Sequence, residues 1–348
     1  MGEAAMNSRD RLLNALNRQP HGRAPIWIMR QAGRYLPEYR ALKAKSDFLT
    51  MVRTPELAVE VTLQPLRRFT QLDAAILFSD ILVIPEALGV PYRFREEGGI
   101  AMERTIRTQA DLNGLKPIDA AQRLGYVYAA LRLLRRELGH HKALLGFAGS
   151  PWTLACYLVE GGGSDDFPKT KALLKSDPAF FHQLLGMLAE VVAEYLNQQL
   201  IAGADAIQIF DSWASVLSGA EYEEFSLRYI REVLARLPAH APVILYAKGK
   251  SAEAADLANS GVPCLGVDWT MPLSRVRARV GRPICLQGNL DPEFMVGTPE
   301  AAVNAAQLII ADNGNDPGHI FNLGHGITPQ ARIETVEAVI SAVVGSGD

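Results

Sequence analysis

The sequence contains few cysteines, and their spacing excludes the usual cysteine-based sites. Cys156, Cys264 and Cys285 are odd in number and far apart in the chain. No CxxC pair and no Cys/His ligand spacing accompanies them, so we expect reduced thiols rather than a disulfide framework or a zinc site. This cysteine usage is typical of a cytoplasmic protein, and we expect no bound metal.

The sequence also lacks an excess of charge of either sign and any long apolar run. Its formal net charge is −3 over 348 residues, which gives no indication of binding to nucleic acid or to a membrane surface. No apolar stretch reaches the roughly 20 residues of a membrane-spanning helix, and the first residues contain no signal-peptide core. An anionic substrate would therefore have to be attracted by a local cluster of arginines.

Four common catalytic motifs are absent from the sequence. It has no GxGxxG dinucleotide fingerprint, no GxxxxGK[ST] phosphate loop, no HExxH zinc motif and no GxSxG nucleophile elbow. The glycine cluster at 161–163 is a loop rather than a phosphate cradle, because no Gly-Lys-Ser/Thr follows it. These absences narrow the possible chemistry only in part.

What the sequence does contain is a repeated unit of a short apolar run, a polar end and a helical segment. Runs without alternation are typical of strands buried on both faces in a parallel sheet. Eight such units, with no linker rich in proline, serine or charge, predict an α/β fold with a single (β/α)8 TIM-barrel domain over residues 1–348. The eight runs are residues 24–29, 74–78, 143–147, 206–210, 243–247, 264–267, 283–286 and 319–323.

Two segments are expected to lie outside this repeat. Residues 91–108 alternate around a Gly98-Gly99 turn and are expected to form a β-hairpin insertion. Residues 1–7 are expected to be disordered. A doubly wound sheet with an appended domain is the alternative fold, but it would need a break in composition that the sequence does not show.

In a parallel barrel the carboxyl ends of all strands meet at one mouth, where the chemistry is placed. All four tryptophans lie at or beside strand ends, which indicates a wide mouth with aromatic walls, although each one alone could simply plug the top of the barrel. The polar and aromatic residues that the eight runs would deliver to the mouth are Arg30, Arg34, Asp80, Trp152, Tyr157, Asp211, Ser212, Lys248, Asp268, Gln287, Asn289 and His325.

The clearest chemical signal follows the first run. Arg30 and Arg34 carry planar guanidinium groups suited to gripping carboxylates bidentately, and Gly33 lets the backbone come close to a ligand. Asp80 follows the second run and would be ionised beside these arginines, able to accept several N–H donors, or it could merely cap a turn. Residue chemistry alone therefore suggests a polycarboxylate substrate held by charge.

Three other residues of the mouth could each have either a binding role or a structural role. His325 lies between two glycines near the usual anion-binding corner of barrels, but it could be a loop histidine bonded to the backbone. Ser212 could cap a helix, and Tyr157 could belong to the core. Their chemistry alone does not choose between binding and packing.

The same residues form blocks that resemble the uroporphyrinogen decarboxylase family. Residues 29–40 resemble its arginine signature, and residues 78–82, 146–154, 210–213 and 322–326 resemble its other blocks in the same order. The resemblance runs from about residue 8 to the C-terminus. It implies a cytoplasmic, homodimeric (β/α)8-barrel lyase that removes the four acetate carboxyl groups of uroporphyrinogen III as CO2, giving coproporphyrinogen III in haem biosynthesis, without cofactor or metal.

The resemblance also implies roles for individual residues. Asp80 would accept the pyrrole N–H groups and stabilise the protonated pyrrole, and Arg30 and Arg34 would bind carboxylates. Asp80 and Arg30 are the expected catalytic residues, while the proton donor stays open among Arg30, a protonated substrate carboxyl group and a water. The expected substrate contacts are Arg30, Gln31, Ala32, Gly33, Arg34, Asp80, Tyr157, Ser212 and His325.

Two other functions fit parts of this pattern. Zinc-dependent methyltransferases that act on corrinoid-bound methyl groups resemble the decarboxylases in fold, but they carry a His-x-Cys motif where this chain reads Tyr246-Ala247-Lys248. A non-catalytic tetrapyrrole carrier would share the binding residues. A turnover assay with uroporphyrinogen would separate the three functions.

Overall fold

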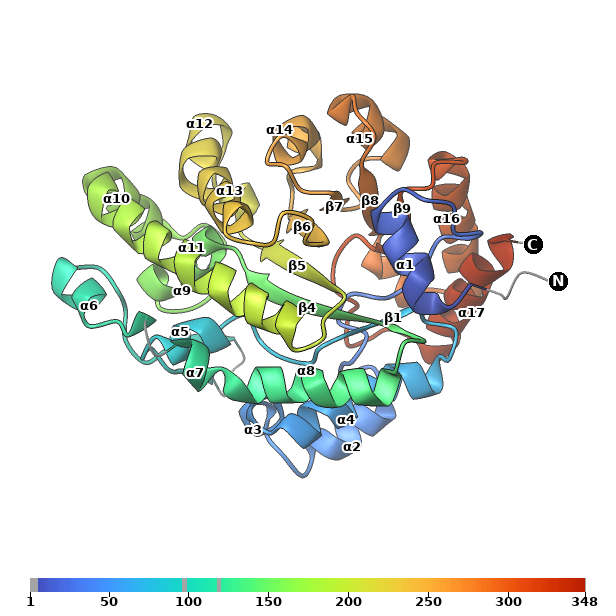
Figure 1. Cartoon of the computed structure of the whole chain (residues 1–348), viewed down its shortest axis with the longest axis horizontal. Helices are drawn as coiled ribbons and strands as arrows, with labels where there is room; N and C mark the ends of the chain where they lie inside the picture. Colours follow the sequence, from blue (N-terminus) through green and yellow to red (C-terminus); the bar gives the residue numbers. More distant parts are fainter. Residues whose placement is uncertain (1–5, 96–98, 118–119, 348) are drawn as a thin grey trace.

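The computed structural model describes residues 6–95, 99–117 and 120–347. Its centre is a curled sheet of seven parallel strands in the order β1-β4-β5-β6-β7-β8-β9, so each strand pairs with the next one along the chain (Figure 1). The strands are β1 (Ala74–Ile76), β4 (Ala143–Gly149), β5 (Ala206–Asp211), β6 (Val243–Ala247), β7 (Cys264–Gly266), β8 (Cys285–Leu290) and β9 (His319–Leu323).

Helices cover the outside of this sheet, and those that connect successive strands follow one another around it in Figure 1. Within the described part of the chain, no helix combines the length and hydrophobicity needed to span a bilayer. The helices are α1 (Ser8–Leu16), α2 (Pro37–Lys43), α3 (Phe48–Arg53), α4 (Pro55–Arg68), α5 (Val83–Ala87), α6 (Gln109–Asn113), α7 (Ala120–Arg123), α8 (Gly125–Leu138), α9 (Pro151–Glu160), α10 (Pro168–Ser176), α11 (Pro178–Ile201), α12 (Gly219–Tyr222), α13 (Arg228–Ala235), α14 (Ala254–Ala258), α15 (Leu273–Val280), α16 (Pro299–Asn313) and α17 (Ile333–Val344).

Local sequence explains where several of these helices begin. Ser150, Thr298 and Asp177 each cap a helix N-terminus with a side-chain oxygen and are each followed by proline at the first helical position. Of the segment 1–7 that was expected to be disordered, residues 1–5 lie outside the described residues. Asn7 caps α1 by accepting the N–H of Asp10.

The first expected strand, residues 24–29, is reduced to a single bridge. Ile26 pairs in parallel with Phe321 of β9, and on its other side its carbonyl accepts the N–H of Asp73 at 2.8 Å. This segment therefore fills the gap between β9 and β1, an arrangement consistent with a TIM barrel.

Side chains explain why this segment is not a regular strand. The amide N–H groups of Ile26 and Met29 donate to the side chains of Asp73 and Asn322, each at 2.8 Å. The N–H of Ile28 donates to the Gln31 side chain at 3.0 Å. Because side chains satisfy these buried donors, the segment needs no continuous ladder.

The inside of the curled sheet is packed with side chains rather than open. Trp27, Leu145, Ile244, Tyr246 and Ile320 belong to one buried apolar cluster there. In its middle, the indole of Trp27 donates to Gln287 at 2.9 Å. This packing is typical of barrels, whose chemistry therefore sits at the strand ends and not in a central pore.

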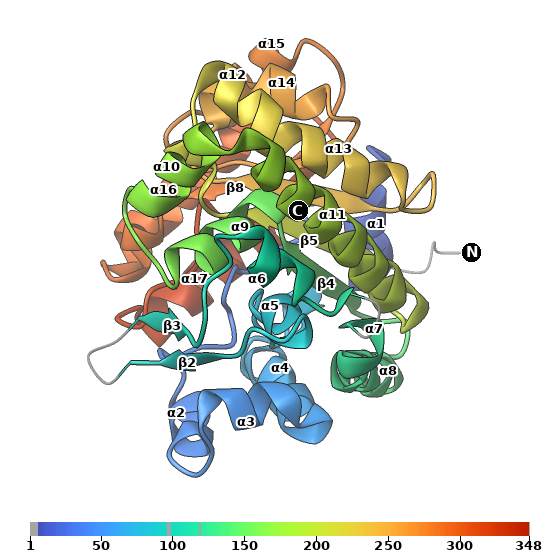
Figure 2. The same ribbon diagram turned by 90° about the vertical axis from the view of Figure 1, so that its left-hand side faces the viewer.

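A separate pair of short strands lies in the region of the expected hairpin insertion. β2 (Tyr92–Phe94) and β3 (Ile100–Met102) pair antiparallel, with Tyr92 opposite Met102, and stand at the edge of the molecule in Figure 2. The turn at 96–98 lies outside the described residues, and residues 103–108 are not in a strand. The ring of Phe94 packs on that of Phe48 at 5.1 Å, which ties β2 to the start of α3.

Candidate active site

A cleft of about 1310 Å³ opens where the carboxyl ends of the strands meet. Its walls come from the loop after the Ile26 bridge, from α2 and α3, from the loop after β1, and from the ends of β4, β5, β6 and β9. Ligand pockets for small molecules usually measure about 300–1,000 Å³. The volume therefore suits a large ligand.

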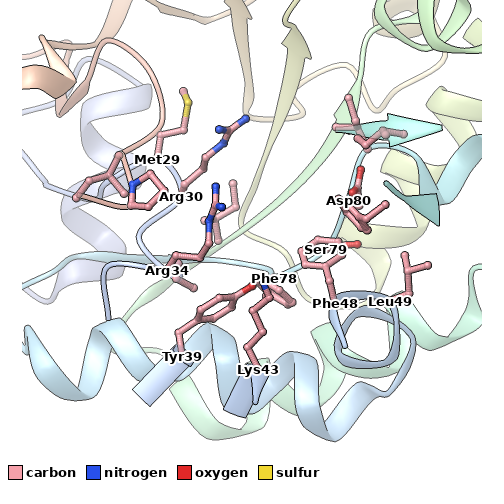
Figure 3. Close-up of a pocket in the computed structure, with 18 of the residues that line it drawn as sticks. Met29, Arg30, Arg34, Tyr39, Lys43, Phe48, Leu49, Phe78, Ser79 and Asp80 are labelled. Carbon is pink, nitrogen blue, oxygen red and sulfur yellow. The ribbon is translucent and has the colours of Figure 1, made fainter. Parts of the chain in front are cut away.

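One wall of the cleft carries two arginines. Arg30 and Arg34 extend side by side from their loop, and neither guanidinium forms an ion pair with another described residue (Figure 3). Arg30 has a φ of 63°, a left-handed conformation that costs a non-glycine residue about 1–2 kcal/mol. Strain of this kind is often kept where it aims a functional side chain.

The neighbouring glycine makes room for Arg30. A Cβ atom added at Gly326 would lie 2.4 Å from Cδ of Arg30, so only glycine lets that side chain pass. Gly326 belongs to the loop after β9, nearly 300 residues away in sequence. The arginine wall is therefore shaped by both ends of the chain.

Asp80 stands on the opposite side of the cleft from the two arginines (Figure 3). The N–H of Leu82 donates to its Oδ1 at 2.9 Å, which fixes the carboxyl group. Burial raises the pKa of Asp80, while the Leu82 N–H, the Tyr92 hydroxyl and the Arg30 guanidinium work against that rise. The carboxylate is therefore poorly solvated, so a donor or cation from a ligand would interact with it strongly.

The remaining wall is aromatic with polar tips. Phe147 and Phe210 pack edge to face at 5.6 Å, and Tyr157 packs against Trp213 at 6.1 Å. Burial raises the pKa of Tyr157 to about 12, so its hydroxyl keeps its proton at neutral pH. This wall suits a flat, largely apolar ring system.

Ser212 reaches the cleft because its neighbour is anchored below it. The carboxylate of Asp211 is fully buried and accepts hydrogen bonds from four hydroxyl groups. Burial raises the pKa of Asp211 and these donors oppose the rise. The anchor holds the loop after β5 against α9 and the helical segments that follow. The four donors are Ser150, Thr153, Tyr222 and Ser226.

His325 lines the cleft from the loop after β9, and Lys248 lines it from the loop after β6. The pKa of His325 is lowered to about 4, first by burial and then by the nearby cations Arg30 and Lys248. At neutral pH the imidazole is therefore uncharged. The loop that presents Lys248 is fixed by Asp268, which accepts the N–H of Gly249 at 2.8 Å.

The structure brings most of the expected contacts into the cleft but not Gln31. That side chain is 1% exposed, accepts from the Ile28 N–H and donates to the Ala74 carbonyl, both at 3.0 Å. The Gln31 side chain therefore holds the arginine loop from beneath and does not line the cleft. The expected contacts that do line the cleft are Arg30, Ala32, Gly33, Arg34, Asp80, Tyr157, Ser212 and His325.

Several residues of the expected mouth serve as internal supports instead. Gln287 and Asn289 fall within β8 rather than after it, and the Asn289 side chain donates to the carbonyls of Asp268 and Met271. The indole of Trp152 donates to the Trp213 carbonyl at 3.0 Å. The members of the set that are buried and do not line the cleft are Trp152, Asp211, Asp268, Gln287 and Asn289.

Three lysines that line the cleft, Lys43, Lys45 and Lys248, were not among the expected substrate contacts. Lys248 follows the fifth apolar run directly, and the sequence placed it at the mouth without assigning it a contact with the substrate. Lys43 lies four residues after Tyr39 on α2, which puts both on one helix face, and both line the cleft. The i, i+4 spacing was the available signal for Lys43.

A curled parallel sheet covered by helices, with a large cleft rich in cations at its strand ends, is typical of α/β enzymes that bind anionic ligands. Comparison with known proteins gives the family. The model of the family "Uroporphyrinogen decarboxylase (URO-D)" matches residues 7–345, and the chain belongs to this family.

Proteins named uroporphyrinogen decarboxylase are similar to this chain over nearly its whole length. The chain is 49% identical over 340 residues to the uroporphyrinogen decarboxylase of Azotobacter vinelandii, covering 96% of each protein. It is 49% identical over 342 residues to that of Cellvibrio japonicus, covering 97% of this chain and 96% of the relative.

Solved structures of other proteins share the fold. A methyltransferase from Methanosarcina mazei superposes with a TM-score of 0.83 at 22% identity, covering 98% of this chain and 99% of that one. At this identity the likeness concerns the fold alone. Within the described ranges, no three His, Cys, Asp or Glu side chains are grouped to hold a metal ion.

Proposed function

We propose that this chain is a uroporphyrinogen decarboxylase, which converts the four acetate side chains of uroporphyrinogen III to methyl groups and releases CO2. The observation that carries the proposal is one large cleft with Arg30 and Arg34 on one wall and the desolvated carboxylate of Asp80 on the other. A tetrapyrrole with carboxylates on its rim and N–H groups at its centre matches both walls.

The binding mode follows from the two kinds of donor and acceptor. Arg30 and Arg34 grip rim carboxylates through paired N–H groups, and the backbone of Ala32 and Gly33 lets the rim approach closely. Asp80 has one oxygen held by Leu82, and the carboxylate accepts pyrrole N–H groups from the ligand. Tyr157, Ser212 and His325 complete the contacts along the rim.

The chemistry needs no cofactor because the substrate ring is the electron sink. Protonating a pyrrole carbon makes a cation, the C–C bond to the carboxylate breaks, and its electron pair neutralises that cation as CO2 leaves. A second proton then reaches the exocyclic methylene carbon, and the first proton leaves the ring. Each decarboxylation therefore consumes one proton in total. Asp80 stabilises the cation, and fixed charges in a poorly solvated cleft are usually the largest catalytic effect.

The source of the first proton is open among three groups. Arg30 stands in the cleft with a guanidinium that is a poor acid in water but is placed near the ring. A protonated carboxyl group of the substrate and a water are the other two. Asp80 has the same role in all three cases, because it acts on the cation and not on the donor.

The proposal includes the architecture that goes with this function. The Ile26 bridge and its hydrogen bond to Asp73 support closure of the sheet into a single-domain (β/α)8 barrel. Pairing of β2 with β3 supports a hairpin insertion beside the cleft. A homodimer with facing clefts is proposed from the family resemblance alone.

The test is turnover of uroporphyrinogen III by the purified protein under anaerobic conditions. We expect CO2 and coproporphyrinogen III in a ratio of about four to one, without added metal or cofactor. Tight binding of the tetrapyrrole with no release of CO2 would instead identify a carrier. Activity that appears only when zinc and a methylated corrinoid are supplied would identify a methyltransferase.

A further inference from the structure

Tyr246 links β6 to the loop after β9, which carries His325. It lies on β6, is 1% exposed, and its hydroxyl donates to the carbonyl of Gly324 at 2.9 Å. The same hydroxyl oxygen is 3.0 Å from Nδ1 of His325. The two rings lie nearly parallel, at 14° and with centroids 5.9 Å apart. Tyr246 itself does not line the cleft, whereas His325 does.

The single hydroxyl proton decides which nitrogen of His325 carries hydrogen. The carbonyl of Gly324 can only accept, so the Tyr246 proton must point at it to satisfy the 2.9 Å contact. If that proton pointed at Nδ1 instead, the hydroxyl oxygen of Tyr246 and the carbonyl oxygen of Gly324 would lie 2.9 Å apart with no hydrogen between them. The hydroxyl oxygen therefore accepts from Nδ1, and Nδ1 carries the hydrogen.

The protonation of Nδ1 determines whether the second ring nitrogen, Nε2, carries a hydrogen. His325 is neutral at pH 7 because burial and the cations Arg30 and Lys248 lower its pKa to about 4. A neutral imidazole has only one N–H group. With that group on Nδ1, the other ring nitrogen, Nε2, has a lone pair and no hydrogen.

We propose that Tyr246 is a positioning residue that holds His325 in the Nδ1–H tautomer, so that His325 offers the cleft a hydrogen-bond acceptor at Nε2. A lone pair repels a bare carboxylate and attracts a group that carries a proton. In a substrate rich in carboxyl groups, that group is an acetic or propionic acid side chain in its protonated form. This ligand assignment rests on the proposed function, whereas the tautomer assignment does not.

The consequence for the reaction concerns the proton supply. Arg30 and Lys248 would pair with ionised side chains, while Nε2 of His325 would favour one that keeps its proton. A protonated substrate carboxyl group is one of the three candidates for the proton donor. The Tyr246–His325 pair therefore favours this candidate by stabilising the acid form inside the cleft.

The test is nitrogen NMR of protein labelled with ¹⁵N-histidine at pH 7.5, without ligand. His325→Asn identifies the His325 resonances among those of the seven histidines. We expect the Nδ1–H tautomer of His325 to dominate by about tenfold or more in the unsubstituted protein. Tyr246→Phe removes the acceptor for Nδ1–H, and we expect the ring to shift toward the Nε2–H form.

Tyr195→Phe is the matched control, since it also deletes a buried tyrosine hydroxyl, one with no hydrogen-bond partner among the described residues. We expect it to leave the His325 tautomer unchanged. An Nε2–H form in the unsubstituted protein would overturn the proposal even if Tyr246→Phe failed to fold. A folded Tyr246→Phe protein that keeps the Nδ1–H form would overturn it as well.

A second measurement tests the ligand class. Coproporphyrin III, titrated into the labelled protein, should shift the Nε2 resonance if one of its carboxylic acids donates to it. If the porphyrin bound without moving that resonance, a protonated carboxyl group would be ruled out as the partner of Nε2. The tautomer experiment uses no substrate, so its failure and a failure to decarboxylate are separate results.

Discussion

At the scale of single residues, the cleft works by placing charges that have few internal partners. Arg30 is aimed into the cleft by a left-handed backbone, and Asp80 is fixed by the Leu82 N–H while burial raises its pKa. Asp211 and Asp268 are instead surrounded by donors and serve as anchors. The same residue type thus has opposite uses, depending on how many hydrogen bonds the fold supplies.

Arg34→Lys should weaken substrate binding although the charge is kept. A lysine ammonium cannot form the paired N–H contacts of a guanidinium with a carboxylate, so we expect a loss of about 1.5 kcal/mol, or about tenfold in KM. Arg132→Lys on α8 is the control, because Arg132 is exposed and does not line the cleft. Equal KM values for both variants would mean that Arg34 is merely solvated.

Asp80→Asn should separate binding from chemistry. The amide keeps an acceptor of similar size but loses the negative charge, so affinity for a porphyrin product should fall moderately. The chemical step should fall by about 10²–10³, because the lost interaction is stronger with the cation than with the neutral ring.

The measurement is single-turnover decarboxylation alongside equilibrium binding. Asp80→Glu is the companion variant, since it keeps the charge but moves it, and misplacement of about 1 Å can cost about 10²-fold. If Asp80→Asn bound poorly yet decarboxylated bound substrate at the normal rate, Asp80 would be only a docking group.

At the scale of elements, the loops after the strands are held from below by buried polar side chains. Gln31 ties the arginine loop to the start of β1, Asp211 ties the loop after β5, and Asp268 ties the loop after β6. Gln31 and Asp211 each belong to the loop or strand end that they hold, whereas Asp268 follows β7 and holds the loop after β6 from there. Ser212 directly follows the anchored Asp211, and Lys248 directly precedes Gly249, whose N–H Asp268 accepts, and both Ser212 and Lys248 line the cleft.

Gly326→Ala tests how the loop after β9 shapes the arginine wall. The new methyl group would overlap the Arg30 side chain, whose flexible end must then move. We expect normal thermal stability but a fall in kcat/KM of about 10²-fold, because the arginine is displaced by about 1 Å. Gly345→Ala, where nothing lies within 4 Å of the added Cβ, is the control and should leave kcat/KM unchanged.

At the scale of the whole molecule, a buried histidine links the sheet to pH. His319 opens β9, is 1% exposed, and one ring nitrogen lies 2.9 Å from the Gly288 carbonyl. Burial is the main reason that its pKa is lowered to about 4 from the ordinary 6.5. Between these pH values the unfolded chain binds a proton that the folded protein does not, so the free energy of unfolding falls as pH falls from 6.5 to 4.

His319→Gln should make that dependence shallower. The amide can still donate to the Gly288 carbonyl but does not titrate, so up to about 3 kcal/mol of the loss between pH 6.5 and 4 should disappear. Urea unfolding of both proteins across this range provides the comparison, and the difference between them isolates His319 from the acidic groups. Parallel curves for the two proteins would show that His319 titrates normally in the folded state.

The alternation of strands and helices and the main charges of the cleft follow from the amino-acid sequence. Seven apolar runs form strands because short runs buried on both faces have few other ways to satisfy their backbone groups. Asp80 follows the parallel strand β1, and Arg30 and Arg34 follow the segment that pairs with β9 at Ile26, so all three lie at the carboxyl edge of the sheet. These features depend on neighbours in the chain and can therefore be predicted from it.

Which polar residues line the cleft and which turn inward depends on the assembled fold. Gln31 turned inward because buried groups of Ile28 and Ala74 needed partners, and Met29 found its acceptor in Asn322, 293 residues away. The tautomer of His325 depends on a hydroxyl 79 residues distant. Hydrogen-bond satisfaction in the interior is a property of the assembled fold, and no local pattern of residues records it.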